Sequence, residues 1–160
     1  MKVLGFEVKE MEGMELASIH NVGPYMGDQK LFENMFNKLM DWAGPKNLMT
    51  ETTKMVSVYH NDPMTLPEEE HEMSVCISVA KEVTGSGDIK RIKLQSGKYA
   101  IGRYELSDNE YEDAWTNIIR EKMVEANVEM LDGECFEVYL NNPEEHESGK
   151  QILDICIPVK

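Results

Sequence analysis

The chain has 160 residues, a length that fits one domain and can bury a core without metal ions or disulfide cross-links. It carries 16 lysine and arginine residues against 30 aspartate and glutamate residues, for a net charge of -14. This negative field repels phosphate backbones and anionic lipids, so direct nucleic-acid binding and membrane association are not expected. The expected attractions are to cations, cationic amphipaths or a basic protein surface, and solubility alone is the competing explanation of the acidity.

The cysteines and histidines do not form the patterns of metal or redox sites. The three cysteines are far apart in apolar, alternating runs, which predicts reduced, buried strand residues: Cys76, Cys135 and Cys156. The four histidines have no metal-ligand spacing, and dinucleotide and phosphate-loop fingerprints are absent, so neither a metal nor a cofactor is expected. The N-terminus lacks a cleavage site of small residues and no apolar run reaches about 18 residues. The sequence therefore predicts a cytoplasmic protein.

The first half of the chain alternates strands with one helix. Alternating apolar residues predict extended segments at residues 2–8, 15–22, 52–60 and 73–79. Apolar side chains recur at helical spacing from about residue 28 to 43, which predicts an amphipathic helix. Gly44 is expected to take the left-handed cap and Pro45 to forbid another turn.

The second half repeats this order. Strands are predicted at residues 89–94, 99–105, 134–140 and 151–159. The intervening helix opens with Ser107 and Glu110, the spacing of a capping box, while Leu106 and Tyr111 are placed to staple its entry. Trp115 lies on the apolar stripe of this helix.

The two halves are similar in sequence when the chain is aligned with itself at an offset of 80 residues, which aligns position 58 with position 138. Identical pairs then include Val58/Val138, Tyr59/Tyr139, Asn61/Asn141 and Pro63/Pro143. The predicted fold is α+β, with two tandem β-α-β-β repeats of about 1–83 and 88–160 in a single domain, 1–160. Pseudo-twofold symmetry, antiparallel sheets with one long helix per repeat and a central cleft complete this expectation.

The strand at 134–140 combines unusual residue types. One face carries residues expected to be core, Phe136, Val138 and Leu140. The other face carries a thiol, an acid and an aromatic residue, Cys135, Glu137 and Tyr139. This second set suits the floor of a pocket better than a solvated face.

Several segments together resemble the GyrI-like small-molecule-binding domain. They are His20-Asn21-Val22-Gly23-Pro24-Tyr25, Gly97-Lys98-Tyr99-Ala100, Trp115, Phe136-Glu137-Val138-Tyr139-Leu140-Asn141-Asn142-Pro143 and Asp154-Ile155-Cys156-Ile157-Pro158-Val159. This domain is also the effector-binding part of AraC-type and MerR-type multidrug regulators. The resemblance implies a duplicated α+β fold whose cleft takes bulky, often cationic and aromatic compounds. The chain begins at the first strand, so we expect a stand-alone member without direct DNA contact.

The resemblance also assigns residues to a site. It implies that Glu137 faces the ligand, and the corresponding residue of the first repeat is Ser57, so the acid is expected on one wall only. Aromatic walls could attract a cation, and the candidates are Tyr139, Tyr59, Tyr104 and Trp115. For each of these residues the alternative role is packing in the core. Core packing is favoured for Trp115, because it lies on the apolar stripe of its helix. His20 and Tyr25 are expected to hold their turn by hydrogen bonds.

Three functions remain open at this point. The first is a cytoplasmic protein that sequesters or senses hydrophobic, cationic or aromatic small molecules. The second is a hydrolase of small electrophilic xenobiotics that uses Glu137 as its general base. The third, implied by the resemblance and suited to an acidic surface, is an inhibitor protein that binds DNA gyrase.

Overall fold

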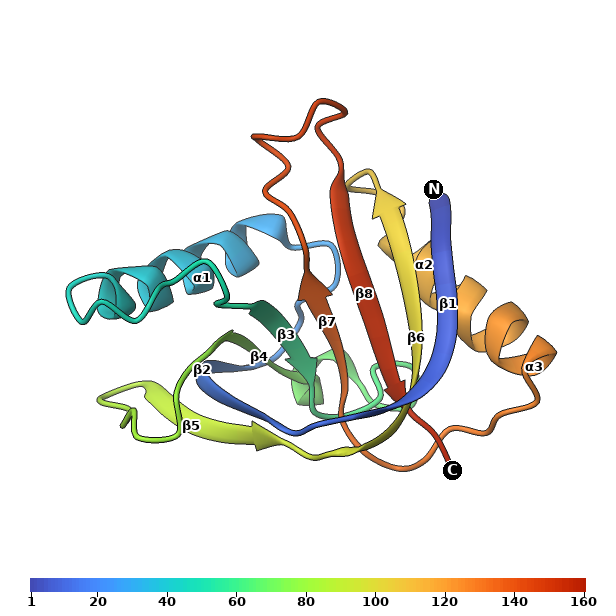
Figure 1. The fold of residues 1–160 in the computed structure, drawn as a ribbon, viewed down its shortest axis with the longest axis horizontal. Helices are drawn as coiled ribbons and strands as arrows, with labels where there is room; N and C mark the ends of the chain where they lie inside the picture. Colours follow the sequence, from blue (N-terminus) through green and yellow to red (C-terminus); the bar gives the residue numbers. More distant parts are fainter. The chain divides into compact units, whose positions relative to one another are not determined.

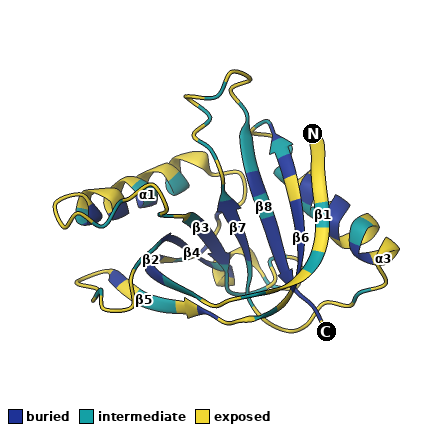
Figure 2. Cartoon of the chain, in the orientation of Figure 1, coloured by how far each residue is buried: buried dark blue, intermediate teal, exposed yellow.

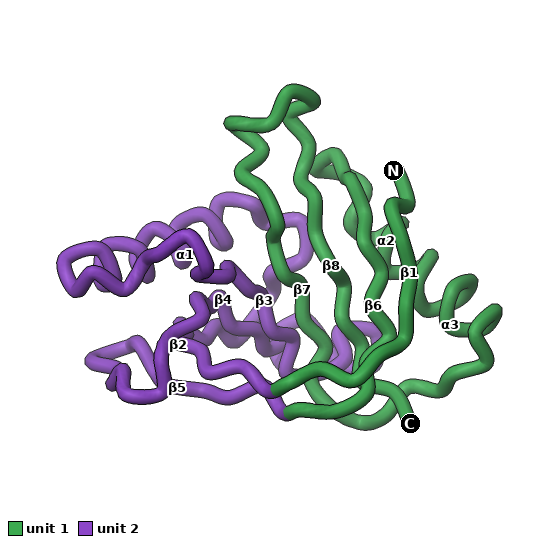
Figure 3. The backbone as a smooth tube through the Cα atoms, viewed as in Figure 1, with its two compact units in different colours: residues 1–12, 96–160 green, residues 13–95 purple.

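The computed structural model describes residues 1–160, which form two compact units (Figures 1 and 3). Unit 1 comprises Met1–Glu12 and Ser96–Lys160, and unit 2 comprises Gly13–Gln95. Each unit contains four antiparallel strands and one main helical segment, so the predicted α+β class is confirmed. No helix in the chain is both long enough and apolar enough to span a bilayer.

Unit 2 packs one helix against a four-stranded sheet. The strands, in their order across the sheet, are β5 (Ile89–Leu94), β2 (Met14–Val22), β4 (Glu72–Ser78) and β3 (Met55–Tyr59). Helix α1 (Gln29–Ala43) buries Met35, Leu39 and Ala43 against sheet residues that include Ala17 and Ile77. The apolar stripe predicted from the sequence is therefore the face that covers the sheet. A short 3-10 turn, η1 (Glu68–Glu70), lies in the loop between β3 and β4.

Helix α1 has a side-chain cap at its start, but its end differs from the prediction made from the sequence. The Asp28 side chain caps the start by accepting a hydrogen bond from the Leu31 N–H at 3.1 Å. At the other end the predicted left-handed Gly44 is wrong, because Gly44 is right-handed with φ -56°. The chain turns further on, where Asn47 has φ 56°. An asparagine tolerates this conformation better than most residues, which is why it can replace glycine there.

Unit 1 has the same architecture. Its strands, in order, are β1 (Lys2–Met11), β6 (Gly97–Leu106), β8 (Gln151–Pro158) and β7 (Cys135–Tyr139). The helical segment comprises α2 (Tyr111–Asn117), the π-helical turn η2 (Ile118–Lys122) and α3 (Met123–Glu125). In Figure 2, most of β6 is buried, whereas β1, at the edge of the sheet, is mostly exposed. Half of the predicted capping box forms, since the Ser107 N–H donates to Glu110 Oε1 at 2.9 Å.

The compact units exchange one strand relative to the repeats expected at about 1–83 and 88–160. Strand β1, from the first half, pairs with β6 in unit 1, and β5, from the second half, pairs with β2 in unit 2. The exchange is reciprocal in register. Ala17 and Ala100 correspond, because they pair with Ile77 and Ile157, which are 80 residues apart. Val8 pairs with Ala100 in one unit, and Arg91 pairs with Ala17 in the other.

Hydrogen bonds in the two β-hairpin loops support the duplication. Asn61 Oδ1 accepts from the Glu72 N–H at 3.0 Å, and Asn141 Oδ1 accepts from the Ile152 N–H at 2.6 Å. Their amide groups donate to the carbonyls of Glu70 and Lys150. Each asparagine thus ties the returning strand to the start of its loop. The repeated Asn-x-Pro motif is therefore structural.

Candidate functional site

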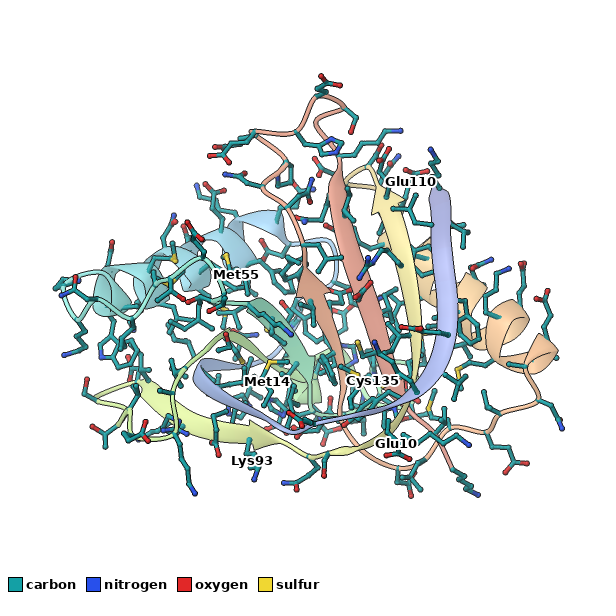
Figure 4. The ribbon with its side chains drawn as sticks, viewed as in Figure 1. Glu10, Met14, Met55, Lys93, Glu110 and Cys135 are labelled. Carbon is teal, nitrogen blue, oxygen red and sulfur yellow. The ribbon has the colours of Figure 1, made fainter.

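Glu137 is a buried carboxylate in the middle of β7. Its side chain is only 2% exposed, although a lone carboxylate loses much hydration free energy on burial. The Trp115 Nε1–H donates to Oε2 at 2.7 Å, and the Tyr139 hydroxyl donates to Oε1 at 2.7 Å. Figure 4 labels Cys135, which begins β7, and Glu110, which immediately precedes α2, the two elements that carry these groups. The structure therefore brings together three of the predicted site residues.

Tyr111, in the first turn of α2, extends this aromatic group. Burial raises the pKa of its hydroxyl, and the negative charges of Glu137 and Asp108 raise that pKa further. The carboxylate of Glu137 therefore acts electrostatically on a third aromatic side chain besides Trp115 and Tyr139. The sequence identified Tyr111 only as a staple at the helix entry, so its electrostatic interaction with Glu137 was missed.

The alternation in β7 accounts for part of this geometry. Glu137 and Tyr139 lie on the same side of the strand, and Tyr139 packs against the core that includes α2. The expectation that Leu140 belongs to the core is wrong, because β7 ends at Tyr139 and Leu140 is 43% exposed. Phe136 and Val138 are buried on the other face, so β7 is buried on both sides.

Tyr104 is placed in the core rather than beside Glu137. Its hydroxyl donates to Asn117 Oδ1 at 2.7 Å, and Asn117 Nδ2 donates to Glu121 Oε2 at 2.9 Å. Burial, followed by the charge of Glu121, raises the pKa of Tyr104 to about 12. The ring lies over Gly102, where a Cβ atom would come within 2.7 Å of Tyr104 Cε2. The glycine thus provides the space for the tyrosine ring.

Tyr59 belongs to unit 2, where it packs on Tyr25 with 5.5 Å between ring centroids. Tyr25 is buried and also contacts the His71 ring at 5.8 Å, while the Gly23 N–H donates to the His71 carbonyl. These contacts agree with a structural role for the turn that contains Tyr25. Ser57, which corresponds to Glu137 in this repeat, is fully buried.

Unit 1 thus carries a buried acid held by two aromatic hydrogen-bond donors within an α+β fold. The chain belongs to the GyrI-like small molecule binding domain family, because residues 5–160 match the sequence model of that family. The resemblance found in the sequence is therefore confirmed. It covers both units, including Glu137 and the residues around it.

Known proteins support the same assignment. A DNA gyrase inhibitor of Erwinia billingiae (strain Eb661) is 27% identical over 159 residues, covering 98% of this chain and 97% of that protein. The crystal structure of the EcmrR C-terminal domain aligns with a TM-score of 0.74 at 14% identity, covering 100% of this chain and 99% of that one. EcmrR in its DNA complex gives a TM-score of 0.78 at 12% identity, with 98% of this chain covered, but this chain spans only 57% of it. SAV2435 bound to tetraphenylphosphonium gives 0.61 at 12% identity, covering 98% of this chain and 94% of that one. At these identities the solved structures show a shared fold.

Proposed function

We propose that the protein sequesters or senses hydrophobic organic cations and that Glu137 supplies the charge that selects them. The observation that supports this most is the burial of the Glu137 carboxylate between its hydrogen-bond donors Trp115 and Tyr139. A buried carboxylate gains from a nearby cation, because the cation compensates for lost hydration. Aromatic faces add about 0.5 to 2 kcal/mol for each well-placed cation–π contact.

Two neutral side chains donate to Glu137. The Trp115 Nε1–H and the Tyr139 hydroxyl hold the two carboxylate oxygens by hydrogen bonds, and neither group carries a positive charge. A quaternary phosphonium or ammonium ion donates no hydrogen bond, so it would interact with Glu137 through charge and with the rings through their faces. We therefore expect selection by charge and aromatic character rather than by a fixed hydrogen-bond pattern.

The test compares tetraphenylphosphonium, the ligand bound to SAV2435, with neutral triphenylphosphine oxide by isothermal titration calorimetry. Glu137→Gln preserves side-chain shape and removes the charge, so we expect at least tenfold weaker binding of the cation and little change for the neutral compound. Glu144→Gln, in an exposed loop, changes the net charge equally and should leave binding unchanged. Trp115→Phe provides a second site variant if Glu137→Gln does not fold. Equal affinity of the wild type and Glu137→Gln for tetraphenylphosphonium would refute the assignment of Glu137.

Inhibition of DNA gyrase is a second candidate. Relatives that share nearly the whole chain are named DNA gyrase inhibitors, and a net charge of -14 suits a basic partner surface. Purified gyrase should then lose supercoiling activity as the protein is added at low salt. Unchanged supercoiling together with no capture of gyrase would exclude this function. Glu137→Gln should still inhibit, because Glu137 is buried away from any protein surface.

Hydrolysis receives less support from the geometry. A general base must accept a proton from a water molecule next to the substrate, whereas both oxygens of Glu137 already accept hydrogen bonds from Trp115 and Tyr139. We therefore expect stoichiometric binding without product when small electrophilic esters are added. Turnover that is lost in Glu137→Gln would instead establish the hydrolase.

A further inference from the structure

An open hollow of about 490 Å³ lies in unit 2, whereas Glu137 is in unit 1. It is lined by residues 81–87, which follow β4, and by residues 89–91 at the start of β5. Its charged lining residues are Lys81, Lys90 and Arg91 against one acid, Glu82, and Arg91 is additionally paired with Glu15 outside the lining, which leaves Lys81 and Lys90 as the positive excess. In a chain with a net charge of -14, this is a local excess of positive charge.

Arg91, which lines this hollow, has one hydrogen-bond donor left over. Its Nη1 group donates to the carbonyls of Lys81 and Val83, and its Nη2 group donates to Glu15 Oε2 at 2.5 Å. The Nε–H is buried and has no hydrogen-bond partner. A buried donor without a partner costs about 1–3 kcal/mol, so such groups normally have a bound water, ion or ligand.

The duplication shows that packing alone does not require an arginine here. Arg91 pairs with Ala17 in unit 2, and the corresponding pair in unit 1 is Val8 with Ala100. Val8 packs against the core of its unit as an ordinary apolar edge residue. The same position therefore accepts a valine in one unit, whereas in the other it carries a guanidinium group with an unused donor.

The loop around Arg91 is fixed by its own geometry. A Cβ atom on Gly85 would lie 2.2 Å from the Ile89 carbonyl oxygen, so this position requires glycine, and Gly87 has φ +60°, a conformation that favours glycine. The Trp42 Nε1–H also donates to Ser86 Oγ at 2.9 Å, which ties the loop to α1. The hollow is therefore shaped in advance of any ligand, which lowers the entropy cost of binding.

We infer that this hollow is a binding site for a small oxyanion, a carboxylate or phosphate group, which accepts a hydrogen bond from Arg91 Nε and pairs with Lys81 and Lys90. Lys90 is on the edge strand β5, where lysines also protect against aggregation, and that role would make it interchangeable with other lysines of the strand. Lys93 separates the two explanations. It is on the same strand, does not line the hollow, and extends away from the ribbon in Figure 4.

The test titrates the full chain with inorganic phosphate and, separately, with acetate, while chloride keeps the ionic strength constant. The Arg91 Nε–H resonance should shift saturably in the nuclear magnetic resonance spectrum, and the anion that shifts it at lower concentration identifies the chemical class. Lys81→Gln combined with Lys90→Gln should weaken binding at least tenfold, whereas Lys93→Gln should change it less than twofold. Glu137→Gln should leave it unchanged, because the proposed cation site is separate.

Three results would overturn the inference. An Arg91 Nε–H resonance that no anion shifts would mean that water satisfies this donor. A shift that chloride reproduces at equal ionic strength would indicate screening only. An equal loss of binding in Lys93→Gln would show that the general charge of β5, rather than the hollow, attracts the anion. The lysine variants lie on the surface, so the test does not depend on an Arg91 variant that folds.

Discussion

Replacing Gly102 with alanine should destabilise unit 1 through one defined collision. The new Cβ atom would lie 2.7 Å from Tyr104 Cε2 and 3.0 Å from both Tyr104 Oη and Ile118 Cδ1. The Tyr104 ring cannot turn aside freely, because it is fully buried and its hydroxyl is bound to Asn117. Overpacking of this kind costs about 1–3 kcal/mol, and losing the hydrogen bond adds about 1 kcal/mol. Alanine also lowers the conformational entropy of the unfolded chain, which offsets about 0.4–1 kcal/mol, so we expect a net loss of about 1–4 kcal/mol in the free energy of unfolding.

The measurement is urea unfolding followed by tryptophan fluorescence. The chain has two tryptophans, Trp42 in unit 2 and Trp115 in unit 1, so a Trp42→Phe background reports on unit 1 alone. Gly5→Ala is the matched control, since a Cβ atom there meets nothing within 4 Å and the residue is exposed. If Gly102→Ala unfolded at the same urea concentration as Gly5→Ala, the reasoning about the tyrosine ring would be refuted.

Two further predictions concern other parts of the fold. Tyr104 has a pKa of about 12 in the folded state against about 10 when unfolded, so its contribution is complete below pH 10 and is lost as the pH rises from 10 to 12. The stability advantage of the wild type over Tyr104→Phe should therefore shrink by about 2 kcal/mol in urea titrations across that window, and a constant difference would contradict the burial argument. Asn141→Ala should cost about 1–2 kcal/mol in the same assay, because it removes bonds to Ile152 and Lys150, whereas the exposed Asn142→Ala should cost less than half as much.

The sequence predicted the strands and α1 well because these elements depend on local periodicity. Alternation in β4 and the helical stripe of α1 each point to one buried face, and no other part of the chain is needed to recognise it. The conformation of Gly44 was predicted wrongly because a Gly-Pro pair indicates where a helix ends but not which residue makes the turn. The exchange of β1 and β5 was not predicted, since strand alternation carries no information about which partner a strand selects.

Part of the candidate site could also be predicted from local sequence patterns. The family resemblance indicated Glu137, and the strand period placed Tyr139 on its side. Trp115 was expected to be mainly core, and the structure adds its hydrogen bond to Glu137, which depends on where α2 packs over β7. Tyr111 was missed because the helix entry and β7 are distant in sequence. Arg91 gave no signal at all, since a basic residue on an edge strand is ordinary until its partners are known.

The exchange of strands also orders events during synthesis. Unit 2 is complete once residue 95 has been made, whereas β1 is among the first segments made and must await β6 before it has a partner. Until then the ten residues that form β1, which include the apolar Val3 and Leu4, have no partner strand. The lysine and glutamate residues of β1 and the bulge between Val3 and Gly5 disfavour pairing with strands of other chains. They therefore protect β1 from aggregation both before β6 is made and afterwards, when β1 is the edge strand of the folded sheet.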